Sequence, residues 1–390
     1  MSRHLGIEIL GSYTATLNTA SSVVSPFASV VGNNTNMLAA AHRLNAHTYV
    51  RVARASATLT VGLSLLACVV FLAINPSRSG NGSDVGVAWI VIGGASVILG
   101  QAVFAVIQGC LYGDGRSIPA ARVSVGVALA VALSSIVIVP WAGLRGAFAL
   151  LVALSLMPSA IVASGVFLFR EATEPESLAV WRETWDQFVV SSSSMLATAV
   201  ENGVGWACTV YFVQQVFGME GVGLLGIAGQ WQTAMLLPTM SWGGANLKTL
   251  SDTVATGEAP AVFAAMSGLI KRNVLATAVL GAIVSLCSGY LASAYRLSDS
   301  GLAGLICFNA VVALTRAAGG VPELLMVCLR QQRLWLVFSL VASAVQATIT
   351  VVWASHGLWV VVLGVIGASV TRGLLCLIVL PGLVRTGTRR

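Results

Sequence analysis

The segment from Phe217 to Ser241, FGMEGVGLLGIAGQWQTAMLLPTMS, is an apolar stretch of membrane-spanning length that the chain carries twice. The segment from Leu5 to Ser29, LGIEILGSYTATLNTASSVVSPFAS, aligns with it without a gap at an offset of 212 residues. The identical pairs are Gly6 and Gly218, Glu8 and Glu220, Gly11 and Gly223, Pro26 and Pro238, and Ser29 and Ser241. Glycine and proline positions are set by backbone geometry rather than by apolar bulk, so the match predicts an internal repeat.

The composition is that of an integral membrane protein. The 390 residues are 57% hydrophobic and 9% charged, whereas soluble domains carry about 25% charged residues. Hydropathy predicts eleven membrane spans, with no room for a soluble domain. The spans lie near 8–31, 54–74, 86–111, 119–140, 143–169, 187–210, 221–245, 272–294, 301–328, 333–353 and 357–384.

The repeat extends over most of these spans. The first five match the last five in order, at offsets between 212 and 218; Arg54 opens the second span as Arg272 opens the eighth. Equivalent segments enter the membrane in the same direction, which is a parallel repeat. The span 187–210 has no partner, so we expect that an ancestral first helix is missing before residue 1. The predicted fold is an all-α integral membrane protein of about eleven transmembrane helices, twelve minus the first, in two parallel-repeat six-helix-type bundles around a central cavity.

The predicted organisation is an N-terminal bundle over 1–170, a cytoplasmic linker helix over 171–186 and a C-terminal six-helix bundle over 187–390. The linker is the most charged stretch of the chain. Leu178, Trp181, Trp185 and Phe188 fall on one face of the expected helix, which is typical of a helix lying on the membrane surface.

The basic residues predict the orientation. Fifteen of the 21 lie on one side of the membrane and four on the other, with Arg316 and Arg372 inside spans. We therefore expect the basic side and the C-terminus to be cytoplasmic, in a bacterial inner (plasma) membrane. This asymmetry accounts for the net charge of +7, so we expect membrane lipids and no nucleic acid as partners.

Sequence motifs for other chemistries are absent. Neither lysine, Lys248 or Lys271, lies in a GxxxxGK[ST] motif, so no nucleotide is expected. The seven cysteines and four histidines have no zinc-site spacing, and no catalytic triad or carboxylate pair is apparent. We expect no enzyme activity, no cofactor and no metal.

Four charges inside the spans are the strongest candidates for function: Glu201, Arg316, Glu323 and Arg372. A charge at the bilayer centre costs about 2.5–3.5 kcal/mol on insertion scales, so it requires a partner or a wet cavity. The alternative to a functional role is a buried ion-pair cluster that only packs the second half.

Amide side chains extend this polar set. Arg316 and Glu323 are seven residues apart on one helical face, and at an offset of 215 they match Gln101 and Gln108 in the first half. We predict that these four residues line one cavity. Gln230 is a further candidate; it cannot share a face with Gln232, so at most one of the two lines that cavity.

The glycine-rich segment GVGLLGIAGQWQTAMLLPTMS resembles the seventh-to-eighth helix region of polysaccharide (O-antigen type, Wzx-like) flippases, members of the multidrug, oligosaccharidyl-lipid and polysaccharide exporter superfamily. LGIEILGSYTATLNTASSVVSPFASVV resembles their second helix, and AVIQGCLYGDGR with GLRGAFALLVALSL resembles their fourth to sixth helices. The resemblance implies twelve helices in two bundles and alternating access. The implied substrate is an oligosaccharide linked to undecaprenyl diphosphate.

Three functions follow as hypotheses. A flippase needs a cationic cavity for the diphosphate. Arg316 and Arg372 suit such a cavity, because a guanidinium group can donate two parallel hydrogen bonds to phosphate oxygens. A cation-coupled multidrug exporter of the same superfamily would use carboxylates in the first bundle, where Glu8 is the only acid near a span. A non-transporting membrane scaffold is the third. We favour the flippase, with Glu201 and Glu323 holding the arginines or carrying a coupled proton.

Overall fold

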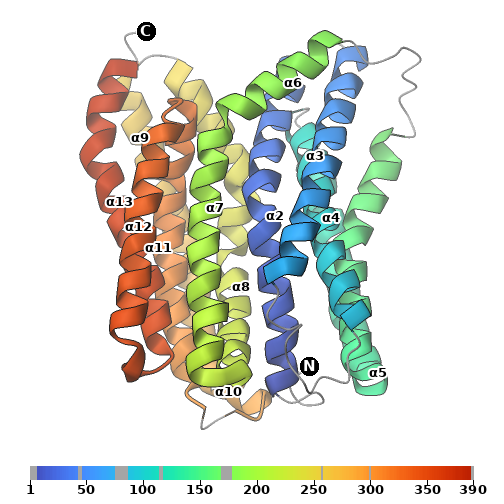
Figure 1. Ribbon diagram of the computed structural model, residues 1–390. Helices are drawn as coiled ribbons and strands as arrows, with labels where there is room; N and C mark the ends of the chain where they lie inside the picture. Colours follow the sequence, from blue (N-terminus) through green and yellow to red (C-terminus); the bar gives the residue numbers. More distant parts are fainter. Residues whose placement is uncertain are drawn as a thin grey trace. The chain divides into compact units, whose positions relative to one another are not determined.

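The computed structural model describes residues 7–42, 46–74, 87–113, 117–167, 178–255, 258–297 and 300–387, and these residues form helices and short connections without a strand (Figure 1). The first-half helices are α2 (Ile7–His42), α3 (Ala46–Ile74), α4 (Val87–Gly113) and α5 (Ser117–Phe167), followed by α6 (Leu178–Val190) and α7 (Ser192–Trp206). A π-helical turn, η2 (Ala207–Phe212), leads into α8 (Val213–Ala255). The remaining helices are α9 (Ala259–Leu286), α10 (Ser288–Ala294), α11 (Leu302–Cys328), α12 (Gln332–Val352), the short η3 (Ala354–His356) and α13 (Trp359–Gly387).

The all-α membrane architecture predicted from composition is confirmed. Within the described residues, eight helical stretches are long and apolar enough to cross a membrane. The helix α2 is not one of them, although it has the length. Hydroxyl and amide side chains between Ser12 and Ser25 make α2 more polar than a typical membrane span.

Glycines break two long helical runs into separate segments. Gly143 (φ 60°, ψ −141°) divides α5, and Gly218 (φ 70°, ψ −176°) divides α8. Residues with a Cβ rarely adopt such backbone angles, so glycine is required at these breaks. Gly357, which the repeat pairs with Gly143, also has a positive φ, of 108°. The repeat alignment therefore matches two glycines that both have a positive φ.

Several helices begin or end beyond the spans that hydropathy predicted. The helix α9 starts at Ala259 rather than near residue 272, because Pro260 stands in its first turn, where proline favours helix initiation. The helix α2 continues past residue 31 to His42. Hydropathy locates the part of a helix that suits lipid and misses its polar extension into water.

The described helices form two compact units, one ending at Gly203 and the other beginning at Val204. In the first, α4 packs against α2, α3 and α5; in the second, α11 packs against α8, α9 and α13. These are equivalent pairings in the predicted repeat, so two repeated bundles are confirmed. The division into 1–170, 171–186 and 187–390 stays a prediction, and residues 171–177 of the linker lie outside the described ranges.

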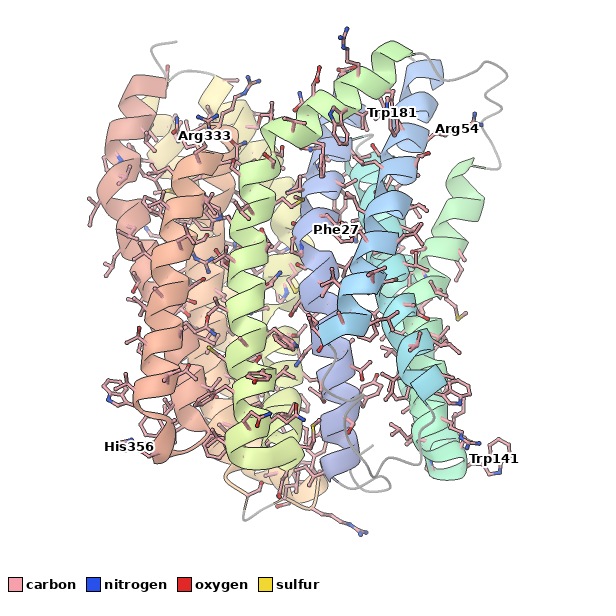
Figure 2. All side chains as sticks on the ribbon, in the orientation of Figure 1. Phe27, Arg54, Trp141, Trp181, Arg333 and His356 are labelled. Atoms are coloured by element: carbon pink, nitrogen blue, oxygen red, sulfur yellow. The ribbon has the colours of Figure 1, made fainter. Side chains whose placement is uncertain are left out.

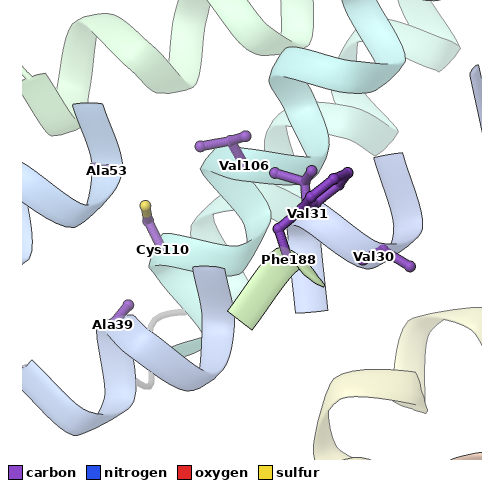
Figure 3. Packing of buried hydrophobic residues seen from close by; sticks show 7 residues of the cluster. All are labelled: Val30, Val31, Ala39, Ala53, Val106, Cys110 and Phe188. Atoms are coloured by element: carbon purple, nitrogen blue, oxygen red, sulfur yellow. The ribbon is translucent and has the colours of Figure 1, made fainter. Parts of the chain in front are cut away.

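The linker helix α6 packs on the first unit, against α2 and α3. Phe188 is buried in a cluster with Val30, Val31, Ala39, Ala53, Val106 and Cys110 (Figure 3). At the junction with α7, Ser191 Oγ donates a hydrogen bond to Asn34 Oδ1 on α2 (2.9 Å). Trp185 lies beside Phe188, with ring centroids 5.7 Å apart, and is 48% exposed. The face that packs on the first unit runs through Thr184, Phe188 and Ser191, and the placement of α6 on the membrane surface stays a prediction.

Within each unit, labelled side chains mark opposite ends of the helices. In the first unit Arg54 and Trp181 lie at one end and Trp141 at the other; in the second, Arg333 and His356 lie at opposite ends (Figure 2). Arg54 and Arg333 both belong to the predicted basic side. The assignment of that side to the cytoplasm stays a prediction.

Candidate substrate-binding faces

The first unit presents an uncharged polar face formed by α2 and α4. Gln101 on α4 is exposed, and its Nε2 donates a hydrogen bond to Ser21 Oγ on α2 (3.0 Å). Gln108, two turns further along α4, is half-buried. Asn18, one turn before Ser21, is half-buried too. We call these four residues the neutral face.

Close packing of α2 on α4 positions this face. A Cβ at Gly109 would collide with the carbonyl oxygen of Gly32 and lie 2.9 Å from the Cβ of Thr35. A Cβ at Gly32 would lie 3.1 Å from the carbonyl oxygen of Ala105. Small residues allow two helix backbones to approach closely in a membrane. The hydrogen bond between Gln101 and Ser21 depends on that approach.

The equivalent face of the second unit carries charges. Gln230 and Thr233 on α8 are exposed, whereas the repeat-related Asn18 and Ser21 are half-buried. On α11, Arg316 is exposed like Gln101, and Glu323 is half-buried like Gln108. We call Gln230, Thr233, Arg316 and Glu323 the charged face. The two repeats thus present equivalent helix faces of different charge.

Arg372 on α13 lies close to the charged face. Its guanidinium carbon stands 5.1 Å from the ring centroid of Trp335 on α12, a buried side chain. A guanidinium stacked on an indole retains in-plane N–H donors that suit phosphate or carboxylate oxygens. Cys376, one turn beyond Arg372, lies within electrostatic reach of both Arg372 and Glu323. The structure therefore gathers side chains from α11, α12 and α13 in one region of the second unit.

The seven predicted site residues are divided between the two units. Arg316, Glu323, Arg372 and Gln230 belong to the second. Gln101, Gln108 and Glu201 belong to the first; Glu201 is half-buried on α7, two residues before Gly203. Their assignment to a single cavity stays a prediction. Gln232 is buried whereas Gln230 is exposed, in agreement with the argument that the two amides cannot share a face.

Sequence reasoning missed three contributors. Trp335 had no signal in the sequence, because it meets Arg372 only through the packing of α12 on α13. Asn18 and Ser21 could have been found: they align with Gln230 and Thr233 and are three residues apart on one helical face. Within the described ranges, no three or more His, Cys, Asp or Glu side chains gather as metal ligands would.

Comparison with solved structures identifies the fold. It is that of transporters of the multidrug/oligosaccharidyl-lipid/polysaccharide (MOP) superfamily, and in particular of its MATE family. An inward-facing multidrug resistance MATE transporter matches with a TM-score of 0.72 over 99% of this chain and 92% of its own, at 16% identity. An outward-facing MATE transporter matches with a TM-score of 0.68 over 100% of this chain and 96% of its own, at 14% identity.

A third similar structure is a MOP superfamily transporter from Pyrococcus furiosus, with a TM-score of 0.68 over 100% of this chain and 96% of its own, at 12% identity. It is described as having a binding pocket of reversed polarity that suggests a different function. No protein-family profile matches this chain, and no curated protein matches it. The comparisons therefore define a MATE-like fold with two repeated bundles, as expected from the repeat.

Proposed function

We propose that this protein is a membrane transporter that moves its substrate by alternating access. The match of nearly the whole chain to both inward-facing and outward-facing MATE transporters supports this function. Transport of this kind requires no enzymatic step on the substrate. By the distribution of basic residues, we place the protein in a bacterial inner membrane with the C-terminus in the cytoplasm.

A multidrug exporter, which would carry organic cations, is the assignment that the structural neighbours favour, since two of them are multidrug resistance transporters. In this chain Glu201 on α7 and Glu323 on α11 are carboxylates that could meet a cation, as is Glu8 at the start of α2. The alternative, a lipid-diphosphate-linked oligosaccharide such as an undecaprenyl diphosphate glycolipid, is favoured by the side chains. Arg316 and Arg372 can each donate to phosphate oxygens, and Trp335 holds the Arg372 guanidinium in place.

The charge balance bears on the glycolipid hypothesis. Arg316, Arg372 and Glu323 lie in the second unit and sum to a charge of +1. Protonation of Glu323 would raise that charge to +2, which suits a diphosphate better. Substrate binding and proton uptake would then be linked.

Transport assays separate the two substrate classes. Proteoliposomes should be tested for translocation of undecaprenyl diphosphate-linked N-acetylglucosamine and, separately, for efflux of ethidium. Glycolipid movement that Arg372→Ala abolishes, with normal protein amounts, supports the flippase. Arg372→Lys should restore only part of the glycolipid movement, because lysine keeps the positive charge but cannot donate two parallel hydrogen bonds from one planar group.

Ethidium efflux that survives Arg372→Ala and is lost in Glu323→Gln supports the exporter. Absence of transport of either probe by the wild-type protein in both orientations would favour the non-transporting scaffold. If Arg372→Ala moves the glycolipid at the wild-type rate, Arg372 is a packing residue.

A further inference from the structure

The helix α2 has a polar surface that a membrane helix does not need for packing. Along one side, its exposed or half-buried side chains are Asn18, Ser21, Ser22, Ser25, Ser29 and Asn33. Their spacing of three or four residues keeps them on one face of an α-helix. Gln101 and Gln108 of α4 extend this surface sideways, and the hydrogen bond from Gln101 to Ser21 joins the two helices.

Thr14 lies one turn before Asn18 on the same face. Its side chain is 3% exposed, and its Oγ1 has no hydrogen-bond partner within the described residues. Leaving a buried hydroxyl unpaired costs about 1–3 kcal/mol. The neighbouring Thr16 and Thr19 avoid this cost by donating to carbonyl groups of their own helix (2.9 and 2.7 Å). Thr14 is therefore a buried polar group that the described residues leave unpaired, next to this surface but not accessible from outside the bundle.

Ser29 Oγ donates to the Pro26 carbonyl oxygen of its own helix (3.2 Å). Lipid chains offer no hydrogen bonds, so the groups of this face without such a bond meet water or a polar ligand. The sequence places no Asp, Glu, Lys or Arg between Ile9 and Ala41 of α2, or anywhere in α4. A diphosphate would find no positive charge here, and an organic cation would find no carboxylate. Hydroxyls and amides can both donate and accept, which suits a ligand that does the same without carrying charge. A sugar is such a ligand.

The two repeats differ in the charge of this helix face. The equivalent helix face of the second unit has Arg316 and Glu323 where the first has Gln101 and Gln108. We propose that the neutral face (Asn18, Ser21, Gln101 and Gln108) binds the sugar portion of a lipid-linked saccharide. This inference rests on the glycolipid form of the proposed function.

The test compares two probes, undecaprenyl diphosphate and undecaprenyl diphosphate-linked N-acetylglucosamine, binding to the full-length protein in nanodiscs. The test variant combines Ser21→Ala with Gln101→Met, which removes two polar groups at accessible positions with little change of volume. We expect the wild-type protein to bind the glycosylated probe more tightly. Two lost neutral hydrogen bonds should weaken binding of that probe about tenfold, with binding of the sugar-free probe unchanged.

Thr58→Val is the matched control. Thr58 is exposed on α3 and donates to the carbonyl of Arg54 in its own helix (3.1 Å), so its loss should change neither affinity. Should the double variant fail to elute as a folded protein, Ser21→Ala alone serves, with an expected loss of about threefold.

The outcomes separate the inference from the function on which it rests. Wild-type protein that binds both probes equally, or a double variant that keeps the wild-type preference, overturns the sugar site and leaves the glycolipid hypothesis standing. Wild-type protein that binds neither probe overturns both. A sugar preference lost in the double variant, with binding of the sugar-free probe unchanged, supports the sugar site on the neutral face.

Discussion

Replacing Gly109 by alanine should separate α2 from α4 and destabilise the first unit. The new Cβ would overlap the carbonyl oxygen of Gly32 and press on Thr35 Cβ at 2.9 Å and on the backbone nitrogen of Asn36 at 3.1 Å. Two of these contacts are backbone atoms of a long helix, so no side-chain rotation relieves them. The helices have to move apart instead.

The magnitude follows from two opposing effects. Overpacking a close contact costs about 1–3 kcal/mol. A gap of 0.5–1 Å along a helix interface also forfeits about a quarter to a half of each dispersion contact. Alanine in place of glycine within a helix gains about 0.5–1 kcal/mol. We therefore expect Gly109→Ala to lower the free energy of unfolding by about 1–2 kcal/mol in net terms.

Gly62→Ala supplies the matched control. Gly62 lies within α3 of the same unit, and an added Cβ there meets nothing within 4 Å. It should raise stability by about 0.5–1 kcal/mol, because only the helix-propensity gain remains. Unfolding of both purified variants in urea and detergent, followed by tryptophan fluorescence, measures the difference. Equal stabilisation by the two substitutions would show that the α2–α4 approach is looser than described and would refute the reasoning.

The remaining predictions concern single contacts. Gly218→Ala should lower the free energy of unfolding by about 1–3 kcal/mol despite open space around its Cβ, because the positive φ of 70° strains an alanine; an unchanged unfolding midpoint would contradict this. Ser191→Ala removes the donor to Asn34 and should speed proteolysis at the α6–α7 junction, while leaving the unfolding of the second unit unchanged. Trp335→Leu should weaken binding of undecaprenyl diphosphate about two- to fivefold through loss of the cation–π contact with Arg372; equal affinity would show that Arg372 is positioned without it.

The sequence by itself determined the architecture. Low charge and long apolar segments require a membrane protein of helices, since a spanning helix satisfies its backbone hydrogen bonds internally. The gapless match of Leu5–Ser29 with Phe217–Ser241 indicated the repeat, because backbone geometry fixes glycine and proline positions independently of the apolar residues around them. The offset of 215 also paired Gln101 with Arg316 and Gln108 with Glu323, and the two members of each pair proved equally exposed.

Contacts between helices were decided only by the tertiary structure. Arg372 and Trp335 are far apart in the sequence, and the packing of α13 on α12 brings them to 5.1 Å. The hydrogen bond between Gln101 and Ser21 depends on how closely α2 approaches α4. The face by which α6 packs depends on the buried cluster that surrounds Phe188. Hydropathy cannot give any of these, because it records which residues avoid water and not which of them meet one another.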